Sequence, residues 1–418
     1  MKSLTIVGGG WAGLAAAVLA TQQGWRVRLL EAAPQLGGRA RRIQHHGLAL
    51  DNGQHILIGA YRDTLQLMRT LGLKPEELLL RLPMNMQTAQ GQGLRLPDGP
   101  TPLNLLWGVA SASGWSAADK WGLTKRSVAW QWAGFQCDAL TSVASLCQGL
   151  PPRVMADLIE PLCVSALNTP CEAASGQVFL RVLQDALFSG QGSSDMLLPR
   201  VDLGQLLPDA AHAWLQAHGA EVLLGHRVSD LQSLQDAPLL LACPAWEAAA
   251  LTQSVAPAWS AQASGLQHTA ITTVYARTQQ ALHWPSPMIA LVSGPEAPAQ
   301  FAFDKGRISR ETAMQGVLAL VVSASQSPRD ELTQAVLQQA QSQLGLQDLQ
   351  LLTTVVEKRA TFACTPGLNR PSMRVAPRVW ACGDFIQGPY PATLEGAVQS
   401  GFAAVSAMAS ERMGENTA

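Results

Sequence analysis

The 418-residue chain has few charged residues: Asp, Glu, Lys and Arg make up 14% of it, against about 25% in ordinary soluble domains. Neither sign dominates, since 29 Lys and Arg stand against 30 Asp and Glu, and this excludes the basic surface that nucleic-acid binding requires. Hydrophobic residues reach 47%, which excludes a disordered chain. No run of about 20 strongly apolar residues predicts a membrane-spanning helix.

Cysteine is scarce and irregularly spaced. The chain has seven, an odd number, and no two have Cys-x-x-Cys spacing, so neither a disulfide framework nor a metal site is predicted. Such residues are typical of buried thiols in a reducing compartment. A Gly-rich segment follows Lys2 too closely for the apolar core of a signal peptide. We therefore expect a cytoplasmic protein.

What the first sixty residues do contain is a dinucleotide-binding pattern. A short apolar run leads into Gly-Gly-Gly-Trp-Ala-Gly at 8–13, followed by an Ala-rich helical stretch and a second strand that ends at Glu31. Gly8 permits the tight turn, Gly10 lets the backbone approach a pyrophosphate, and Gly13 lets the helix pack on the strand. The helix N-terminus favours phosphates, and Glu31 is placed to accept hydrogen bonds from ribose hydroxyls.

Other segments resemble the FAD-binding proteins of the glutathione reductase and amine oxidase superfamily. Gly37-Gly38-Arg39 resembles their extended FAD fingerprint, in which the guanidinium binds phosphate or ribose. Gly383-Asp384 and the helix expected from Leu394 resemble the C-terminal half of the signature, whose helix points its N-terminus at the flavin. The segment 219–228 resembles the middle FAD segment, with a strand at Val228 pairing with adenine.

The order of these segments predicts an α/β fold. A Rossmann-type FAD-binding domain, similar to those of glutathione reductase and the amine oxidases, is expected to comprise 1–82, 201–264 and 375–418. It is interleaved with an α+β substrate-binding domain comprising 83–200 and 265–374.

Five further stretches are similar to one group within the superfamily: Asp-Asn-Gly-Gln-His at 51–55, Asn-Thr-Pro at 168–170, 177–180, 197–200, and Pro-Ala-Thr-Leu-Glu-Gly-Ala at 391–397. They resemble the squalene-associated FAD-dependent desaturase group, to which the bacterial hydroxysqualene dehydroxylases belong. The resemblance implies reductive removal of the hydroxyl of hydroxysqualene, an allylic C30 alcohol, to give squalene. The chain departs from related carotenoid desaturases at Gly388-Pro389-Tyr390, where those often carry a Thr- and Gly-rich stretch.

The resemblance also implies the cofactor and partners. FAD is expected to bind non-covalently, because the loop before Glu395 holds no Cys, and an external reductant, NAD(P)H or a reduced carrier, is expected. Contact with a membrane surface and with squalene-synthase-like enzymes is expected too. The implied cofactor-binding residues are Gly8, Gly10, Ala12, Gly13, Glu31, Ala32, Gly38, Arg39, Gly53, Gln54, His55, Val228, Gly383, Asp384, Leu394, Glu395, Gly396 and Ala397.

The hydroxyl must leave as water, helped either by a general acid or by ionisation to an allylic cation. His55 is one candidate because its segment is expected to pass the flavin ring, although it can instead orient the loop. Glu160, flanked by Ile159 and Pro161, is the second, because a partly buried Glu has a raised pKa and can donate. Asp51 is expected either to take part or to cap the local turn.

Three alternative functions use the same fold. A phytoene or carotene desaturase would run the hydride transfer in the opposite direction. A flavin amine oxidase is disfavoured, because its Lys and aromatic cage contrast with the six Lys and three Tyr of this chain. A non-enzymatic prenyl-lipid escort protein would lack the FAD motifs.

The scarcity of charged residues is most pronounced in one region, where 20 uncharged residues separate Asp98 from Asp119. We predict that Leu103–Trp132 forms amphipathic helices that rest on a membrane surface beside an apolar tunnel; buried core helices are the alternative. Lys120, Lys125 and Arg126 give the region a mild positive bias. Five of the twelve Trp lie in it: Trp107, Trp115, Trp121, Trp130 and Trp132.

Overall fold

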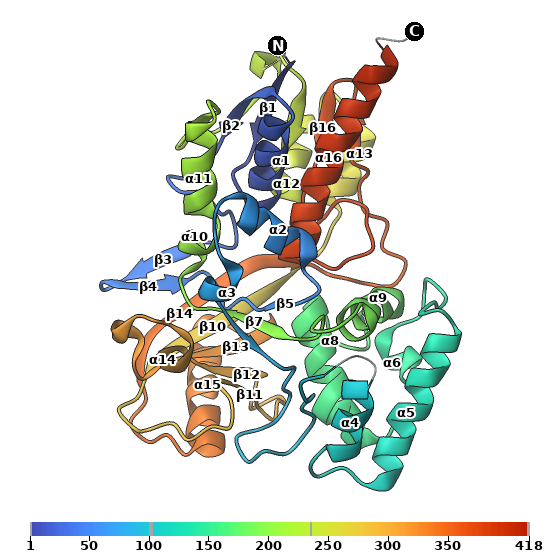
Figure 1. Ribbon diagram of the computed structural model, residues 1–418, viewed down its shortest axis with the longest axis vertical. Helices are drawn as coiled ribbons and strands as arrows, with labels where there is room; N and C mark the ends of the chain where they lie inside the picture. The colour runs from blue at the N-terminus through green and yellow to red at the C-terminus, as the bar shows by residue number, and fades with distance from the viewer. Residues whose placement is uncertain (1, 100–102, 235, 416–418) are drawn as a thin grey trace.

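The computed structural model describes residues 2–99, 103–234 and 236–415. Its upper part in Figure 1 is built on a six-stranded sheet, and both ends of the chain lie at the top of that part. The strand order is β15-β16-β9-β1-β2-β8. The strands are β1 (Lys2–Val7), β2 (Trp25–Leu30), β8 (Glu221–Leu223), β9 (Leu239–Leu241), β15 (Arg374–Ala376) and β16 (Val379–Ala381).

The register of this sheet gathers the carboxyl ends of its five parallel strands, β1, β2, β8, β9 and β16, at one edge. β1 is parallel to β2 and β9, with Val7 opposite both Leu30 and Leu241. β16 is parallel to β9, with Ala381 opposite Leu241, and β15 alone among the paired strands of this sheet runs antiparallel to its neighbour. The segments after β1, β2, β9 and β16 therefore meet outside the carboxyl ends of the strands, where α/β sheets bind their ligands.

Helices cover both faces of the six-stranded sheet. α1 (Trp11–Gln22) is buried almost all round because it lies against the sheet and against α16 (Leu394–Glu415). A Cβ added to Gly401 of α16 would lie 2.4 Å from the Ala12 carbonyl oxygen, so the two helices approach closely. The other helices of this part are α2 (Arg62–Thr70), α3 (Pro75–Leu78), α10 (Leu203–Leu206), α11 (Pro208–Ala217), α12 (Ala245–Thr252) and α13 (Pro257–Ser264).

The lower part contains a five-stranded antiparallel sheet in the order β11-β12-β13-β10-β14. Side chains of β13 alternate between its two faces. Leu318, Leu320 and Val322 belong to the core under α15 (Arg329–Leu344), whereas Ala319 and Val321 belong to the core on the opposite face. The strands are β10 (His268–Arg277), β11 (Met288–Ala290), β12 (Phe301–Asp304), β13 (Val317–Ser325) and β14 (Gln350–Phe362), and α14 (Lys305–Ile308) follows β12.

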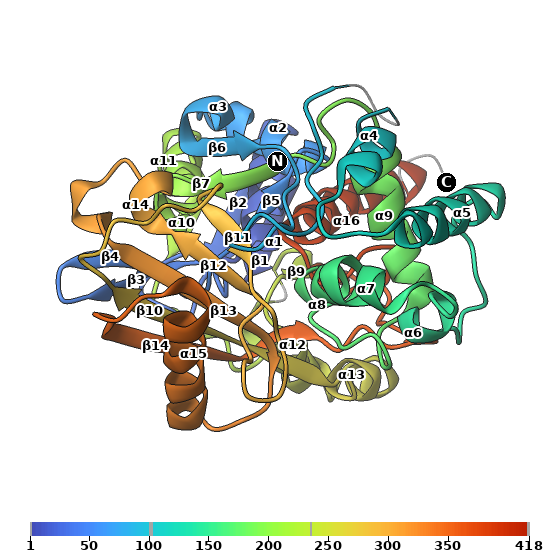
Figure 2. The same cartoon turned by 90° about the horizontal axis from the view of Figure 1, so that it is seen from below.

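A helical group lies beside this sheet, as the view from below shows (Figure 2). It consists of α4 (Leu103–Ser111), α5 (Ala117–Trp132), α6 (Val143–Leu146), α7 (Pro152–Val154), a π-helical turn (Met155–Ile159), α8 (Glu160–Leu167) and α9 (Gly176–Phe188). The start of α5 is fixed by a capping box in which Ser116 and Asp119 satisfy each other's backbone amides. The prediction of helices in Leu103–Trp132 is confirmed.

Two small sheets complete the fold. β3 (Arg42–His45) and β4 (Leu48–Asp51) form a hairpin, and β5 (Leu57–Ile58), β7 (Met196–Pro199) and β6 (Leu79–Leu82) form a three-stranded sheet in that order. Short 3-10 turns occupy Gln232–Leu234 and Thr312–Met314. The boundaries proposed for the two interleaved domains stay a prediction.

Candidate active site

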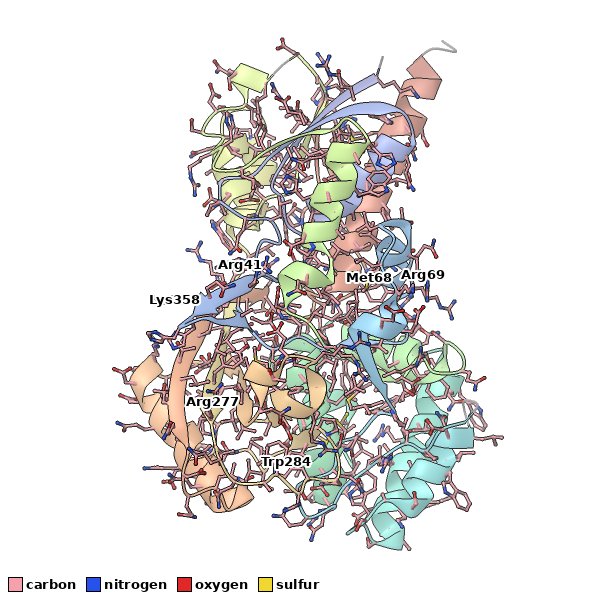
Figure 3. The ribbon with its side chains drawn as sticks, turned by 60° about the vertical axis from the view of Figure 1, so that its left-hand side comes forward. Arg41, Met68, Arg69, Arg277, Trp284 and Lys358 are labelled. Carbon is pink, nitrogen blue, oxygen red and sulfur yellow. The ribbon has the colours of Figure 1, made fainter. Side chains whose placement is uncertain are left out.

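One large cavity joins the two parts of the molecule. Its volume is about 890 Å³, and it runs from the carboxyl edge of the six-stranded sheet to the five-stranded sheet and to α8 and α9. Arg41, on its wall, lies at the level where the upper and lower parts meet (Figure 3). Of the residues that the sequence assigned to FAD, all but Gly13 and Gly396 line this cavity.

The upper end of the cavity has the features of a dinucleotide site. Gly10, Trp11 and Ala12 line it at the start of α1, and the first amides of a helix have no partner within the helix. The Glu31 carboxylate lies beside them, where it accepts hydrogen bonds from the backbone amides of Gly9 at 2.6 Å and Ala33 at 2.7 Å. Free amides next to a fixed carboxylate fit a pyrophosphate joined to a ribose.

At two positions the neighbouring backbone lies so close that only glycine fits. A Cβ on Gly13 would lie 2.0 Å from the Gly8 carbonyl oxygen, and one on Gly8 would lie 2.6 Å from the Ala242 carbonyl oxygen. Gly13 thus packs the helix against the turn, and its absence from the cavity wall agrees with a packing role. Gly37 bridges to Gly10, which brings the second Gly-rich segment onto the first.

Arg39 links the beginning of the chain to its end. Its Nη2 donates to Asp384 Oδ1 at 2.5 Å across 345 positions of sequence, and its Nη1 donates to the Ala360 carbonyl at 2.6 Å. The exposed fraction of the side chain is 31% for Arg39 and 8% for Asp384. Both line the cavity, so the pair presents a fixed guanidinium and carboxylate to it.

The start of α16 is anchored by Glu395. Its buried carboxylate accepts hydrogen bonds from the Asp63 amide at 3.0 Å, the Thr64 amide at 2.9 Å and the Thr64 hydroxyl at 2.6 Å. The carboxylate thereby caps α2 while Leu394, Glu395 and Ala397 line the cavity. The acid that sequence reasoning assigned to the cofactor therefore also fixes two helices together.

His55 lies on the cavity wall, but the position of its ring proton and its lowered pKa argue against the role of general acid. Nδ1 is 2.7 Å from the Gly53 carbonyl, and because a carbonyl only accepts, Nδ1 carries the proton. Burial lowers the pKa of His55. A neutral ring with its proton held at Nδ1 leaves Nε2 as a hydrogen-bond acceptor, so His55 suits orientation better than proton donation.

Two expectations about single residues are wrong. Glu160 is exposed at the start of α8 and is not part of the cavity wall, so it is not the partly buried acid that its apolar neighbours suggested. Val228 lines the cavity, but it lies in a loop, because β8 ends at Leu223. The turn at 224–225 ends the strand before Val228.

The lower half of the cavity is apolar. The five-stranded sheet contributes Ile271, Met288, Phe301, Phe303 and Val321, while α8 and α9 contribute Leu162, Ala166, Val182, Leu183 and Leu187. Met84 and Met86 add flexible side chains that adapt to irregular shapes. This half is suited to a long hydrocarbon.

Sequence reasoning missed two polar groups near the cavity. Lys305 is buried, with Nζ 3.1 Å from Gln54 Oε1 and 3.7 Å from Asp51 Oδ2. Asp51 also accepts from the Leu203 amide at 2.8 Å, so it supports the segment 51–55 from behind. The second group is formed by Tyr390, Arg181 and Asp185, which come from segments about 200 positions apart. The sequence offered two signals for these groups: the scarcity of Lys and Tyr, and the departure of Gly388-Pro389-Tyr390 from the desaturase pattern.

Comparison with known proteins agrees with this geometry. A family model described as flavin containing amine oxidoreductase matches residues 11–409. Hydroxysqualene dehydroxylase of Zymomonas mobilis is 26% identical, with 96% of this chain and 97% of the relative aligned, and that of Rhodopseudomonas palustris is 26% identical, with 96% of each aligned. An oxidoreductase from Methanosarcina mazei has the same fold, with a TM-score of 0.73 at 12% identity over 97% of this chain and 100% of that structure.

These findings confirm the predicted α/β fold with its Rossmann-type FAD-binding region, and they confirm FAD as the cofactor. A non-enzymatic escort is not supported. The assignment of individual residues to FAD stays a prediction. The chain belongs to the flavin containing amine oxidoreductase family and is an FAD-dependent oxidoreductase.

Proposed function

We propose that this enzyme reductively removes the hydroxyl group of hydroxysqualene to form squalene. The observation that carries the proposal is the single cavity that joins a dinucleotide end to a large apolar half. The name shared by two relatives aligned over nearly their whole length supports the same substrate. When bound and reduced, FAD supplies a hydride to the carbon that loses oxygen.

The residues of the chain position the substrate and exclude water. The apolar wall buries the C30 chain at roughly 25 cal/mol for each Å² removed from water. The allylic carbon that bears the hydroxyl lies toward the polar groups at the junction of the two halves, where His55 and Tyr390 stand on the wall. Exclusion of water protects an allylic cation from recapture.

The enzyme also needs electrons and access to its substrate. We propose that NAD(P)H or a reduced carrier supplies the electrons and that a squalene-synthase-like enzyme supplies the alcohol. The low solubility of both substrate and product supports direct transfer within a membrane. We place the protein in the cytoplasm, in peripheral contact with the inner face of the cell membrane.

The surface of α4 and α5 supports this contact. Of the eleven large apolar side chains exposed in the described part of the chain, six lie on these helices and form the α4–α5 face: Leu103, Leu106, Trp107, Trp121, Val128 and Trp132. Residues 121, 125, 128 and 132 follow one stripe of α5, so Lys125 lies among the apolar side chains. Trp and Leu beside a Lys suit the interface of an anionic bilayer.

The five Trp of this region do not share one environment, contrary to their treatment as a single group in the sequence prediction. Trp107, Trp121 and Trp132 are 68%, 69% and 89% exposed, whereas Trp115 and Trp130 are each 6% exposed. Trp115 donates from Nε1 to Asp157 Oδ2 at 2.9 Å. Among the described residues, no helix has the length and apolarity needed to cross a membrane.

The direction of the redox reaction tests the proposal. Reduced and oxidised enzyme are each incubated without oxygen with hydroxysqualene and, separately, with phytoene. We expect squalene from the reduced enzyme with the alcohol and no product from the oxidised enzyme with the polyene. Dehydrogenation of phytoene by the oxidised enzyme would favour a desaturase instead.

A further inference from the structure

Tyr390 is a cavity residue whose hydroxyl oxygen is bound by a cation. Arg181 Nη2 donates to the Tyr390 hydroxyl oxygen at 3.0 Å, and its guanidinium carbon lies 5.1 Å from the centre of the tyrosine ring. Arg181 Nε donates to Asp185 Oδ2 at 2.9 Å, so one guanidinium joins the Asp185 carboxylate to the Tyr390 hydroxyl. Tyr390 and Asp185 both line the cavity.

The backbone holds Tyr390 beside the cofactor end. Arg370 is 8% exposed, and its Nη1 donates to the Tyr390 carbonyl at 2.9 Å and to the Asp384 carbonyl at 3.2 Å. Arg370 thereby joins Tyr390, in the loop that departs from the desaturase pattern, to the Gly-Asp turn, and α16 begins four residues later at Leu394. Tyr390 stands where this loop meets α9.

The other candidates for a proton donor lack these features. The chain has three Tyr. Tyr275 donates its hydroxyl proton to the Asp51 carbonyl and is not part of the cavity wall. Tyr61 is on the wall, but burial and the nearby Glu395 raise its pKa, and the groups that act on it include no cation. His55 is neutral, with its proton held by Gly53.

We propose that Tyr390 donates the proton that allows the substrate hydroxyl to leave, and that Arg181 stabilises the phenolate formed. The inference rests on the proposed function. The carbon–oxygen bond breaks with both electrons on oxygen, which takes the Tyr390 proton and leaves as water. The allylic cation is neutralised by the hydride already described, and solvent returns a proton to Tyr390 past Asp185, whose side chain is 20% exposed.

The electrostatics of the cluster agree with this role. Burial raises the pKa of Tyr390 and the nearby Asp185 carboxylate raises it further, while Arg181 lowers it. The phenol therefore holds its proton at neutral pH, and the guanidinium favours the charged form once the proton has moved. Arg370, the remaining cation at this loop, contacts carbonyl oxygens and not the phenol.

The test compares two leaving groups in Tyr390→Phe. The variant is assayed with hydroxysqualene and with the analogue in which chloride replaces the hydroxyl, because chloride leaves without a proton. We expect kcat on the alcohol to fall by about 10²–10⁴-fold, the usual contribution of a general acid, and kcat on the chloride to stay near that of the parent enzyme. Asp209→Asn, at an exposed side chain outside the cavity wall, is the control and should act normally on both.

The outcomes separate the inference from the proposed function. Equal loss on both substrates, or little loss on the alcohol, overturns the role of Tyr390. Rescue by chloride in Tyr61→Phe instead assigns the acid to Tyr61. A parent enzyme that converts neither substrate contradicts the proposed function, and with it the inference.

A spectroscopic titration of the flavin-free protein tests the Arg181 contact without turnover. Phenolate absorbance is followed against pH in the parent, in Arg181→Gln and in Tyr390→Phe. The transition missing from Tyr390→Phe belongs to Tyr390, and we expect it to move to higher pH in Arg181→Gln. An unmoved transition overturns the role of Arg181. Where Tyr390→Phe does not retain FAD, Arg181→Gln replaces it in the leaving-group test, with a loss confined to the alcohol.

Discussion

Arg39 Nη2 lies 2.5 Å from Asp384 Oδ1, so the second Gly-rich segment and the C-terminal Gly-Asp turn are joined by one ion pair across 345 positions of sequence. Each residue was assigned to FAD from its own motif, but neither motif predicts that they touch. Their contact joins two segments from opposite ends of the chain at the wall of the cavity.

Asp384→Asn should weaken the retention of FAD. The change keeps the size of the side chain but removes the charge that holds Arg39 in place, and hydrogen bonds to charged groups are worth about 1.5–3 kcal/mol. The measurement is the amount of flavin per polypeptide after gel filtration. Asp209→Asn, which breaks the exposed pair with Arg42, is the matched control and should retain its flavin. Equal retention in both variants would contradict the account of the ion pair.

Glu31→Gln should weaken FAD binding by roughly 1.5–3 kcal/mol, because a ribose diol loses a charged acceptor. The same carboxylate accepts from Gly9 and Ala33, so Glu31→Ala should in addition lower the melting temperature. Titration of flavin-free protein with FAD gives the Kd, and calorimetry gives the melting temperature. An unchanged Kd for both variants would remove Glu31 from the site.

The Glu31 region and the Arg39–Asp384 contact show what the sequence could and could not predict. The turn at 8–13 and Glu31 are close in sequence, and their spacing alone carries the geometry of a βαβ unit. Contacts between distant segments, such as Tyr390 with Arg181, have no local pattern. The strand expected at Val228 failed because β8 is only three residues long, and a short edge strand gives little signal.

Glu395→Gln should destabilise the protein in a way that depends on pH. Burial raises the pKa of Glu395 in the folded chain, and the hydrogen bonds from Thr64 and Asp63 lower it only in part. Folding therefore favours the protonated carboxyl, and the stabilisation present below the ordinary value of 4.5 is lost as pH rises through the folded-state pKa. A neutral amide does not titrate, and it also turns an NH₂ group toward backbone donors, at a cost of about 1–3 kcal/mol.

The measurement for Glu395 is the free energy of unfolding of both proteins by denaturant, at several pH values. We expect the difference between parent and variant to be largest at acid pH and to shrink as pH rises. A difference that widens with pH would show that the carboxylate, and not the carboxyl, is the form that folding favours.

The α4–α5 face should bind lipid. Replacing Trp107 and Trp121 together by Ser should lower sedimentation with anionic liposomes while the melting temperature and FAD content stay near those of the parent, because both side chains are exposed. Trp115→Ser is the contrasting control. It removes a buried side chain and its bond to Asp157, so it should cost about 3–5 kcal/mol of stability. A parent protein that does not sediment with anionic liposomes would contradict the lipid contact.

The composition of the sequence predicts the apolar helices of this region but not which of their side chains are exposed. Low charge and five Trp indicate apolar helices, but they do not say which Trp faces the core. Trp115 precedes α5, and Trp130 lies about 200° round the helix from position 128, so it is buried on the side opposite the exposed stripe. The packing of α5 against its neighbours selects the face, and that information lies in distant residues.

The central claim is that reduced flavin in this enzyme is consumed to remove a hydroxyl group from a C30 alcohol. A single turnover tests it most directly: holoenzyme equilibrated in D₂O, where the transferable hydrogen of the reduced flavin exchanges for deuterium, is reduced with dithionite and mixed without oxygen with one equivalent of hydroxysqualene. The account predicts that the flavin becomes oxidised in step with the appearance of one equivalent of squalene, which carries deuterium at the carbon that bore the hydroxyl. Flavin that stays reduced while the alcohol is recovered unchanged would contradict the account.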